Sequence, residues 1–580
     1  MNLALETLRQ ALACHQRGRL ADAEPLYRRA IELDPGQHDA WRLLGVLFHQ
    51  QGHLELARQF LDRALQTPPV SVEALEALAS VYEALGRISD SIACCQKAHE
   101  LRPDDANILL RLALVQESQG QLREAESCLR KLLDLDPSSA LAHLKLATVL
   151  ESLEKLNEAQ SHAELAIRFA PDSPEPYLCL GTILIRRNRI SDSVPHFNHA
   201  VQLDPVASAC AIGTLREILN EGTRNWESCL ASNPADFDAL LSLAKIRYSE
   251  RRPLEAIELL NRALAVRPGE PNAEYALGFT ELLLGRFESG WQHYEARLRT
   301  GQREFPNRKF AQPLWTGENL AGRTILVHAE QGIGDTIQFI RYLPWIAERG
   351  GRIVLECQPP LKPLLQSLPY VQALVAQGEL LPPFDVQAPL LSLPAIFRTT
   401  LESIHRQTPY LKVPEGARSE LPDAARAGLK VGIVWAGNPV LQNDLVRSLP
   451  LSKLAPLLVL PDISFFSLQV GPAARQIASI ENGKRLIDLG PLLSNFAQTA
   501  CVIQQLDLVI GVDTAVAHLA GALAKPTWLM LPFAPEWRWL LDREDSPWYP
   551  SMRLFRQPAP EDWDSVVRRL KAALQREIGS

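Results

Sequence analysis

The sequence lacks three features that would each assign it to a broad class of protein. No run of roughly 18 apolar residues is present, the length that a helix needs to cross a bilayer, so no transmembrane segment is predicted. The net charge is -7 and no basic block offsets it, which argues against a nucleic-acid-binding protein. The nine cysteines include no C-x-x-C pair, and we expect reduced thiols in a cytoplasmic protein.

The N-terminal segment also lacks the continuous apolar core of a signal peptide. Charged residues interrupt it at Glu6, Arg9 and Arg17. We therefore expect this segment to be the first helix of a repeat rather than a secretion signal.

Proline is abundant and regularly spaced in the first part of the chain. It recurs every 34 residues, at positions 35, 69, 103, 137, 171 and 205. Small residues such as Ala57, Ser91 and Ala125 keep the same register. Proline ends helices and small side chains let two helices approach closely, so the spacing predicts a stack of helix–turn–helix units. This is the tetratricopeptide (TPR) pattern, and it predicts an all-α superhelix with a concave groove.

The repeat pattern also sets the expected domain boundaries. The next turn proline after Pro205 is Pro234, only 29 residues later, so 206–234 is expected to form an irregular repeat. Regular spacing then resumes, and we place the TPR solenoid at 1–300. Residues 301–322 have no helical or strand period and are expected to be a linker.

Beyond the linker, short apolar runs alternate with helical stretches. The runs TILVHA, GRIVLEC, KVGIVWAG, ISFFSLQ, LDLVIGV and PTWLMLP resemble buried parallel strands. Alternation of such strands with helices predicts an α/β domain. We expect two Rossmann-like halves, a short one at 323–425 with four strands and a second at 426–580.

The first candidate site is the turn between a strand and a helix in QGIGDTIQF. Gly332 and Gly334 would let backbone N–H groups face a ligand at the start of the helix. Asp335 has two possible roles, the N-cap of its helix or a general base that takes a proton from an acceptor hydroxyl.

The second candidate site is the corresponding turn in LDLVIGVDTAVAHLAG. A strand at 506–511 is followed by Asp513 and Thr514, and His518 lies one turn into the next helix. The hydroxyl of Thr514 and the helix N-terminus could hold a diphosphate. The alternative is a cap at Asp513 or Thr514 with a structural histidine at 518.

The third candidate is the polar loop after the strand KVGIVW. The loop contains Asn438 and brings Arg447 towards the following helix. A fixed cation beside a diphosphate would stabilise its charge as it leaves.

These three segments resemble the lipopolysaccharide heptosyltransferases (glycosyltransferase family 9) over roughly 324–558. The resemblance implies a GT-B fold and makes Asp335 the catalytic base. The segment VDTAVAHLAGAL resembles the family's diphosphate-binding segment, which implicates Asp513, Thr514 and His518. Combined with the repeats, this domain is similar to bacterial TPR-containing glycosyltransferases.

Two positions depart from the family pattern. Ala515 replaces the usual glycine, so the backbone would approach the phosphates less closely. Arg447 replaces a lysine, which keeps the charge but changes the geometry of the donors. No metal or other cofactor is expected, and the Asp-x-Asp sequences at 236–238 and 562–564 are predicted to be caps and surface carboxylates.

The resemblance implies an inverting, metal-independent glycosyltransferase that uses a nucleotide-diphosphate sugar. Its acceptor would be a protein or glycan recruited by the TPR groove. One alternative is an interaction scaffold with a degenerate, non-catalytic domain. Another is an enzyme like protein O-GlcNAc transferase, but the groove positions carry no asparagine ladder. The groove does carry Glu73, Glu76 and Glu83, a possible acidic patch for a basic partner.

Overall fold

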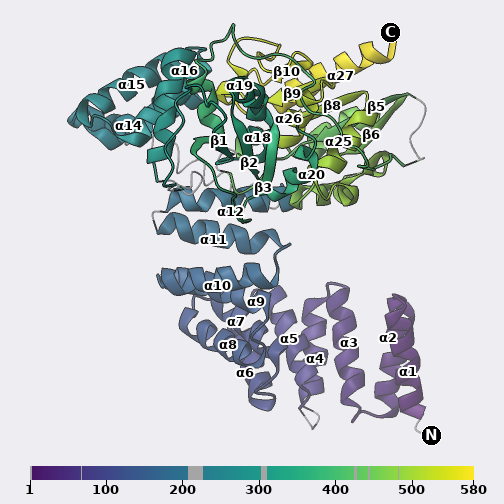
Figure 1. Cartoon of the computed structure of the whole chain (residues 1–580). Coiled ribbons are helices and arrows are strands. Elements are labelled where there is room, and N and C mark those ends of the chain that lie inside the picture. The colour runs from purple at the N-terminus through teal and green to yellow at the C-terminus, as the bar shows by residue number, and fades with distance from the viewer. Residues whose placement is uncertain are drawn as a thin grey trace. The chain divides into compact units, whose positions relative to one another are not determined.

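The computed structural model describes residues 3–66, 68, 70–187, 189–206, 226–301, 308, 310–422, 428–441, 444–480 and 483–579. By its internal contacts the chain divides into two units, Met1–His196 and Phe197–Ser580. Each unit is described by itself, with the elements labelled in Figure 1. No helix among the residues described is long and apolar enough to cross a membrane.

The first unit consists of paired helices and confirms the predicted TPR repeats. Each helix packs against its successor in the chain, α1 with α2 and α3 with α4 (Figure 1). The helices are α1 (Leu3–Gln16), α2 (Leu20–Leu33), α3 (His38–Gln50), α4 (Leu54–Leu65), α5 (Val72–Ala84), α6 (Ile88–Leu101), α7 (Ala106–Ser118), α8 (Leu122–Leu135), α9 (Ala140–Ser152), α10 (Leu156–Phe169) and α11 (Pro174–Arg186), followed by α12 (Ile190–Leu203), which crosses the division. Ala57, Ser91 and Ala125, predicted from their register, are fully buried between helices.

Ion pairs form within and between the repeats of this unit. Arg102 pairs with Glu73 of the same repeat at 2.7 Å, and Arg111 pairs with Glu83 of the preceding repeat at 3.0 Å. Two of the three glutamates of the expected acidic patch are therefore paired with arginines, so the patch carries less net negative charge than its glutamates alone suggest.

The second unit begins with further repeat helices. They are α14 (Phe237–Ser249), α15 (Pro253–Val266), α16 (Pro271–Leu283) and α17 (Phe287–Tyr294), with the 3-10 turn η1 (Glu295–Arg299). Most of the irregular repeat predicted at 206–234 lies outside the described residues. Asp236 caps α14 by accepting a hydrogen bond from the Ala239 N–H at 2.9 Å, and Asp562 accepts one from the Ser565 N–H at 2.9 Å. Both aspartates thus have the capping role predicted for them.

Two parallel sheets follow, as the alternation of strands and helices predicted. The first has the order β3-β2-β1-β4 and contains β1 (Thr324–His328), β2 (Arg352–Cys357), β3 (Val371–Ala376) and β4 (Val386–Pro389). The second has the order β10-β9-β8-β5-β6-β7 and contains β5 (Leu429–Val434), β6 (Ile463–Ser467), β7 (Leu486–Asp488), β8 (Leu508–Val512), β9 (Thr527–Leu531) and β10 (Met552–Arg556). Such sheets place ligand-binding turns at the carboxyl ends of their strands.

Helices and 3-10 turns connect the strands. Those of the first half are α18 (Ile333–Phe339), η2 (Ile340–Tyr342), α19 (Leu343–Glu348), α20 (Lys362–Leu365) and α21 (Leu393–Ile396). Those of the second half are α22 (Asp444–Arg447), α23 (Leu451–Leu458), α24 (Gln476–Ser479), α25 (Phe496–Gln505), α26 (Ala515–Ala522), η8 (Trp537–Trp539) and α27 (Trp563–Gly579).

The last repeat and part of the expected linker belong to the core of the first half. Phe287, Trp291 and Tyr294 of α17 are buried in the same apolar cluster as the strands of the first sheet. Trp315 and Leu320 of the linker are also buried there, and the Trp315 N–H donates to the Gln387 carbonyl at 2.8 Å. The contacts of the structure therefore continue across the boundary predicted at 300.

Candidate functional site

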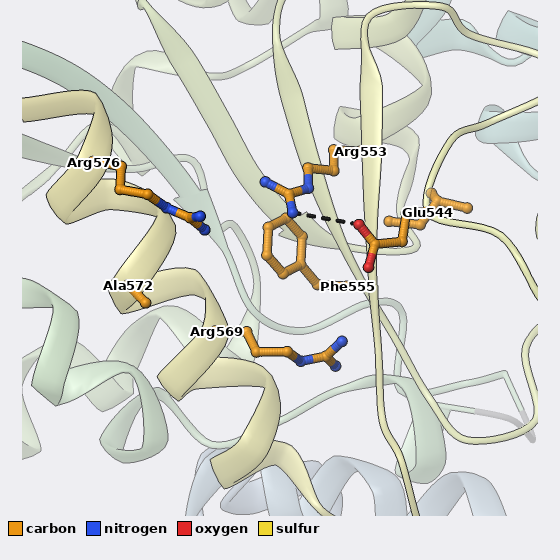
Figure 2. A pocket seen from close by; sticks show the side chains of 7 residues that line it. Glu544, Arg553, Phe555, Arg569, Ala572 and Arg576 are labelled. Carbon is orange, nitrogen blue, oxygen red and sulfur yellow. Dashed lines mark hydrogen bonds and ion pairs between the residues drawn. The ribbon is translucent and has the colours of Figure 1, made fainter. Parts of the chain in front are cut away.

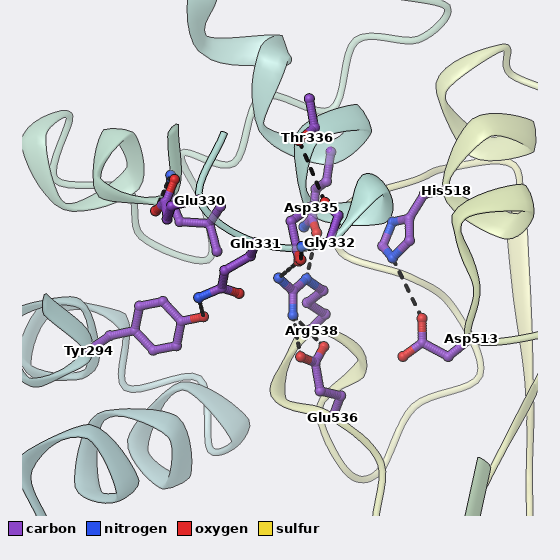
Figure 3. Close-up of polar contacts among 12 residues, drawn as sticks. Tyr294, Glu330, Gln331, Gly332, Asp335, Thr336, Asp513, His518, Glu536 and Arg538 are labelled. Carbon is purple, nitrogen blue, oxygen red and sulfur yellow. Dashed lines mark hydrogen bonds and ion pairs between the residues drawn. The ribbon is translucent and has the colours of Figure 1, made fainter. Parts of the chain in front are cut away.

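Asp335 lies in the first turn of α18, directly after β1. The N-cap residue is Gly332 and not Asp335, which occupies position N3; from there its Oδ2 accepts a hydrogen bond from the Gly332 N–H at 2.9 Å. This also means that the Gly332 N–H, expected to face a ligand, already has a partner. The Oδ1 atom forms an ion pair with Arg538 (Figure 3). The side chain is nevertheless 19% exposed, so Asp335 remains accessible from solvent.

Arg538 is the residue at this site that the sequence analysis missed. It lies in η8, its side chain is 2% exposed, and it bridges Asp335 and Glu536 (Figure 3). Its Nε donates to Gln338 Oε1 at 2.6 Å, and its guanidinium lies 4.3 Å from the centre of the Trp537 ring. Burial alone would lower the pKa of Arg538, but the two carboxylates raise it, and the residue is a fixed cation.

Glu536 has the most unusual carboxyl environment of the site. Burial, together with the charges of Asp513 and Asp335, raises its pKa to about 7 against the opposing effect of Arg538. The Glu536 carboxyl thus changes its protonation near neutral pH. Because both Asp513 and Asp335 act on it, Glu536 connects the two predicted turns electrostatically.

The second turn follows β8, and the side chains of Trp539 and His518 surround the carboxylate of Asp513 in this turn. The Trp539 indole N–H donates to Asp513 Oδ2 at 2.8 Å, and His518 Nε2 lies 3.5 Å from Asp513 Oδ1. Burial raises the pKa of Asp513, but His518, Trp539 and the more distant Arg447 outweigh it and lower the pKa to about 2. The Asp513 carboxylate is therefore ionised throughout the physiological range.

The remaining residues of this turn lie at the start of α26. Thr514 is the N-cap residue, but its side chain accepts no hydrogen bond from the helix. Its Oγ1 is buried and has no hydrogen-bonding partner among the residues that the structure describes. Ala515 is the first residue of the helix. On the other side of the imidazole ring, His518 Nδ1 lies 2.9 Å from the Tyr549 hydroxyl.

Gly334 brings the two predicted turns into contact. A Cβ atom at this position would lie 2.8 Å from His518 Cδ2 and 3.6 Å from the Ala515 Cα. A side chain at 334 would therefore displace the imidazole. Gly334 was expected to leave room for a ligand. In the structure His518 occupies the space beside it, and the absence of a side chain at 334 lets α18 pack against α26.

The third loop is ordered around a buried carboxylate. Asp444 accepts hydrogen bonds from Arg447 Nε at 3.1 Å and from Gln202 Nε2 at 2.6 Å. The Asn438 side chain is turned to its own loop, where it accepts from the Val440 N–H at 3.1 Å. The charge of Arg447 also acts on the second turn, where it helps to lower the pKa of Asp513.

A separate basic hollow of about 160 Å³ lies between β10 and α27 (Figure 2). It is lined by Glu544, Arg553, Leu554, Phe555, Arg569, Ala572 and Arg576. None of the predicted site residues lines it. Within the described ranges, no group of three or more histidine, cysteine, aspartate or glutamate side chains is placed to hold a metal ion.

The family models that match this chain fall into the same two parts as the structure, the repeats and the α/β region. Tetratricopeptide repeat models match residues 8–71, 71–138, 110–174 and 222–301. The model of Glycosyltransferase family 9 (heptosyltransferase) matches residues 473–528, which include the second turn with Asp513, Thr514 and His518.

Individual relatives are similar over parts of the chain. Protein FlbA of Caulobacter vibrioides is 27% identical over 339 residues, which cover 53% of this chain and 56% of FlbA. This chain thus spans about half the length of that relative. PilF of Pseudomonas aeruginosa is 19% identical over 35% of this chain and 92% of its own, with a TM-score of 0.31. A TPR protein from Parabacteroides merdae is 17% identical over 48% and 98%, with a TM-score of 0.30.

The first part of the chain contains the repeats. The second part contains the parallel sheets and the segment that matches the glycosyltransferase family 9 model. The chain is a TPR-containing protein with an α/β region similar to glycosyltransferase family 9.

Proposed function

We propose that the protein is an inverting glycosyltransferase. It would transfer a sugar from a nucleotide-diphosphate sugar to a hydroxyl of a protein or glycan acceptor that the TPR repeats recruit. The observation that carries this proposal is the contact between the first and second turns, in which Gly334 packs on His518. This contact places the Asp335 carboxylate beside the segment that matches the family model.

The chemistry is a single displacement at the anomeric carbon of the sugar. Asp335 accepts the proton of the acceptor hydroxyl as its oxygen forms the new glycosidic bond. The bond from the anomeric carbon to the diphosphate oxygen breaks, and the nucleoside diphosphate leaves with that electron pair. The N-terminus of α26, Thr514, His518 and Arg447 stabilise the charge of the departing diphosphate. In this scheme the protein's own cations replace a metal ion.

The buried Thr514 hydroxyl supports the assignment of the diphosphate site. It has no protein partner among the described residues, and an unpaired buried hydroxyl costs about 1–3 kcal/mol. A phosphate oxygen would accept a hydrogen bond from this hydroxyl. Asp513 does not take the place of the phosphate as acceptor for the Thr514 hydroxyl, because Trp539 and His518 already bind its carboxylate.

A second candidate function is an interaction scaffold with a non-catalytic α/β region. The observation that favours it is the ion pair with Arg538 that engages Asp335. In a scaffold this ion pair would hold the two halves together and would not open for a donor.

Ligand binding and turnover distinguish the two functions. A thermal-shift titration with ADP, UDP and GDP tests for the diphosphate site, since a ligand that binds the folded state stabilises it by mass action. Release of nucleoside diphosphate from a set of ADP-, UDP- and GDP-sugars then tests turnover. We expect Asp335→Asn to lower turnover by about 10²–10⁴-fold. The matched control is Asp22→Asn, which changes an aspartate of the first unit that is 63% exposed and should leave turnover unchanged. No stabilisation by any of the three nucleotides would favour the scaffold.

A further inference from the structure

The contact between Arg538 and Asp335 links two segments that lie about 200 residues apart in the chain. Arg538 lies outside the segment that matches the family model and after the last of the three predicted loops. Its guanidinium is buried and donates to Asp335, Glu536 and Gln338. A buried cation with three acceptors cannot change its position without leaving charges unpaired, so its place is fixed.

The segment that carries Arg538 is held by the terminal repeats. The Tyr248 hydroxyl of α14 donates to the Pro535 carbonyl at 2.9 Å. The rings of Trp291 and Tyr294 in α17 lie 5.2 and 5.9 Å from Trp537, and their planes are steeply inclined to it. The terminal repeats therefore contact the residues on both sides of Glu536 and fix the turn that presents Arg538.

The ion pair orients the Asp335 carboxylate without blocking it. Gly332 N–H donates to Oδ2 and Arg538 donates to Oδ1, so each oxygen receives one of these two hydrogen bonds (Figure 3). Each carboxylate oxygen has about two acceptor sites, and one site on each oxygen remains for another proton.

We propose that Arg538 is a positioning residue that keeps the Asp335 carboxylate oriented for proton transfer, and that the terminal repeats hold Arg538 in place. This inference rests on the proposed glycosyltransferase function. It assigns a role to a residue outside the three predicted loops. It also means that α14 and α17 support the catalytic site and are not only part of the repeats that recruit an acceptor.

Several titratable groups surround Asp335 and must be separated in a test. Tyr294 approaches from α17, His518 and Asp513 from the second turn, and Glu536 from the turn that carries Arg538. The pH profiles of kcat and of the donor KM are therefore measured with the full-length chain in three variants, Arg538→Gln, Arg538→Lys and Glu536→Gln. The probe is nucleoside diphosphate release from the set of ADP-, UDP- and GDP-sugars.

The two arginine variants have different expected outcomes. Arg538→Gln removes the forked donors that hold Oδ1 of Asp335, so we expect kcat to fall on the order of 10²-fold while the donor KM stays unchanged. Arg538→Lys keeps a cationic donor but loses the fork, so we expect kcat to fall less than in Arg538→Gln. Arg543→Gln is the matched control, since Arg543 lies in the same segment but pairs with the exposed Asp545, and its kcat and donor KM should equal those of the wild type.

Two further variants keep the inference falsifiable. Glu536→Gln leaves Arg538 and its contact with Asp335 in place, so we expect a smaller fall in kcat than in Arg538→Gln, and an equal or larger fall would overturn the role assigned to Arg538. Tyr248→Phe removes one hydrogen bond to the 535 carbonyl and leaves Arg538 intact, and we expect kcat to fall several-fold with an unchanged donor KM. If Arg538→Gln does not fold, as shown by its thermal transition, Arg538→Lys and Tyr248→Phe decide the question. Wild-type kcat in both would then overturn the inference.

The same experiment distinguishes failure of this inference from failure of the proposed function. Wild-type turnover in Asp335→Asn would remove the general base and with it the proposed function. Loss of turnover in Asp335→Asn, together with wild-type kcat in Arg538→Gln, would retain the proposed function and refute the positioning role of Arg538 alone.

Discussion

Substitution of Trp291 by alanine should unfold much of the α/β region, although Trp291 belongs to a repeat helix. The side chain is 3% exposed in the core that it shares with the first sheet. Its indole N–H donates to the Thr399 carbonyl at 2.9 Å, and its ring lies 5.2 Å from that of Trp537. The substitution therefore removes a large apolar group and leaves a buried carbonyl without its donor.

The size of the effect follows from these two losses. Replacing a buried tryptophan by alanine costs about 3–5 kcal/mol. The residue Thr399 is 1% exposed, so its orphaned carbonyl adds about 1–3 kcal/mol. The expected total of about 4–8 kcal/mol approaches the whole stability of a typical domain, about 5–15 kcal/mol.

Urea unfolding followed by circular dichroism measures this loss, and limited proteolysis locates it. The matched control is Trp41→Ala in α3, because Trp41 also donates to a carbonyl, that of Pro35 at 3.0 Å, but lies in the first unit. We expect Trp291→Ala to expose 323–580 to protease and Trp41→Ala to expose only the first unit. Protection of 323–580 in Trp291→Ala would refute the assignment of the last repeat to the α/β core.

Three further predictions test other features. A chain that begins at residue 301 should aggregate, whereas one that begins at 226 should fold, because only the longer chain contains the apolar residues of α17. Size-exclusion chromatography would distinguish the two, and a folded monomer from the chain that begins at 301 would contradict the prediction. Gly334→Ala should displace His518 and weaken nucleotide stabilisation in the thermal-shift titration, with a loss of folding stability of about 1–3 kcal/mol from the crowded contact. The pKa of Glu536 is raised from 4.5 to about 7, so the folded protein binds this proton more tightly and its stability falls as pH rises from about 4.5 to about 7, by at most about 3 kcal/mol. Glu536→Gln should lack this fall, which urea midpoints at pH 5 and pH 8 measure; an identical fall in the variant would assign it to another group.

Local periodicity explains which parts of the fold could be predicted from the sequence. The proline interval and the register of small residues are properties of single repeats, and the repeat helices follow them. The strands are likewise marked by short apolar runs, and the turns after β1 and β8 carry the polar residues that were expected there. The contact between these turns through Gly334 and His518 could not be predicted, because a glycine does not reveal whether a ligand or a side chain fills the space beside it.

The parts that sequence analysis missed depend on contacts between distant segments. Arg538 follows a tryptophan-rich stretch that predicts packing, and only the tertiary structure brings its guanidinium to Asp335. The boundary at 300 was placed where the repeat pattern ends, but α17 fits that pattern while its aromatic residues pack on the first sheet. A charged residue among buried aromatics was the available signal, because such a charge needs a partner.

The ion pairs between neighbouring repeats limit how this array can be rearranged. Glu83 has its partner, Arg111, in the next repeat, and Glu126 likewise pairs with Lys155 of the following repeat at 2.8 Å. Exchanging two repeats, or removing one, would bring together faces whose charges do not match. The order of the repeats is thus encoded by electrostatics as well as by shape, and we expect a shuffled array to lose cooperativity even if every repeat retains its own helices.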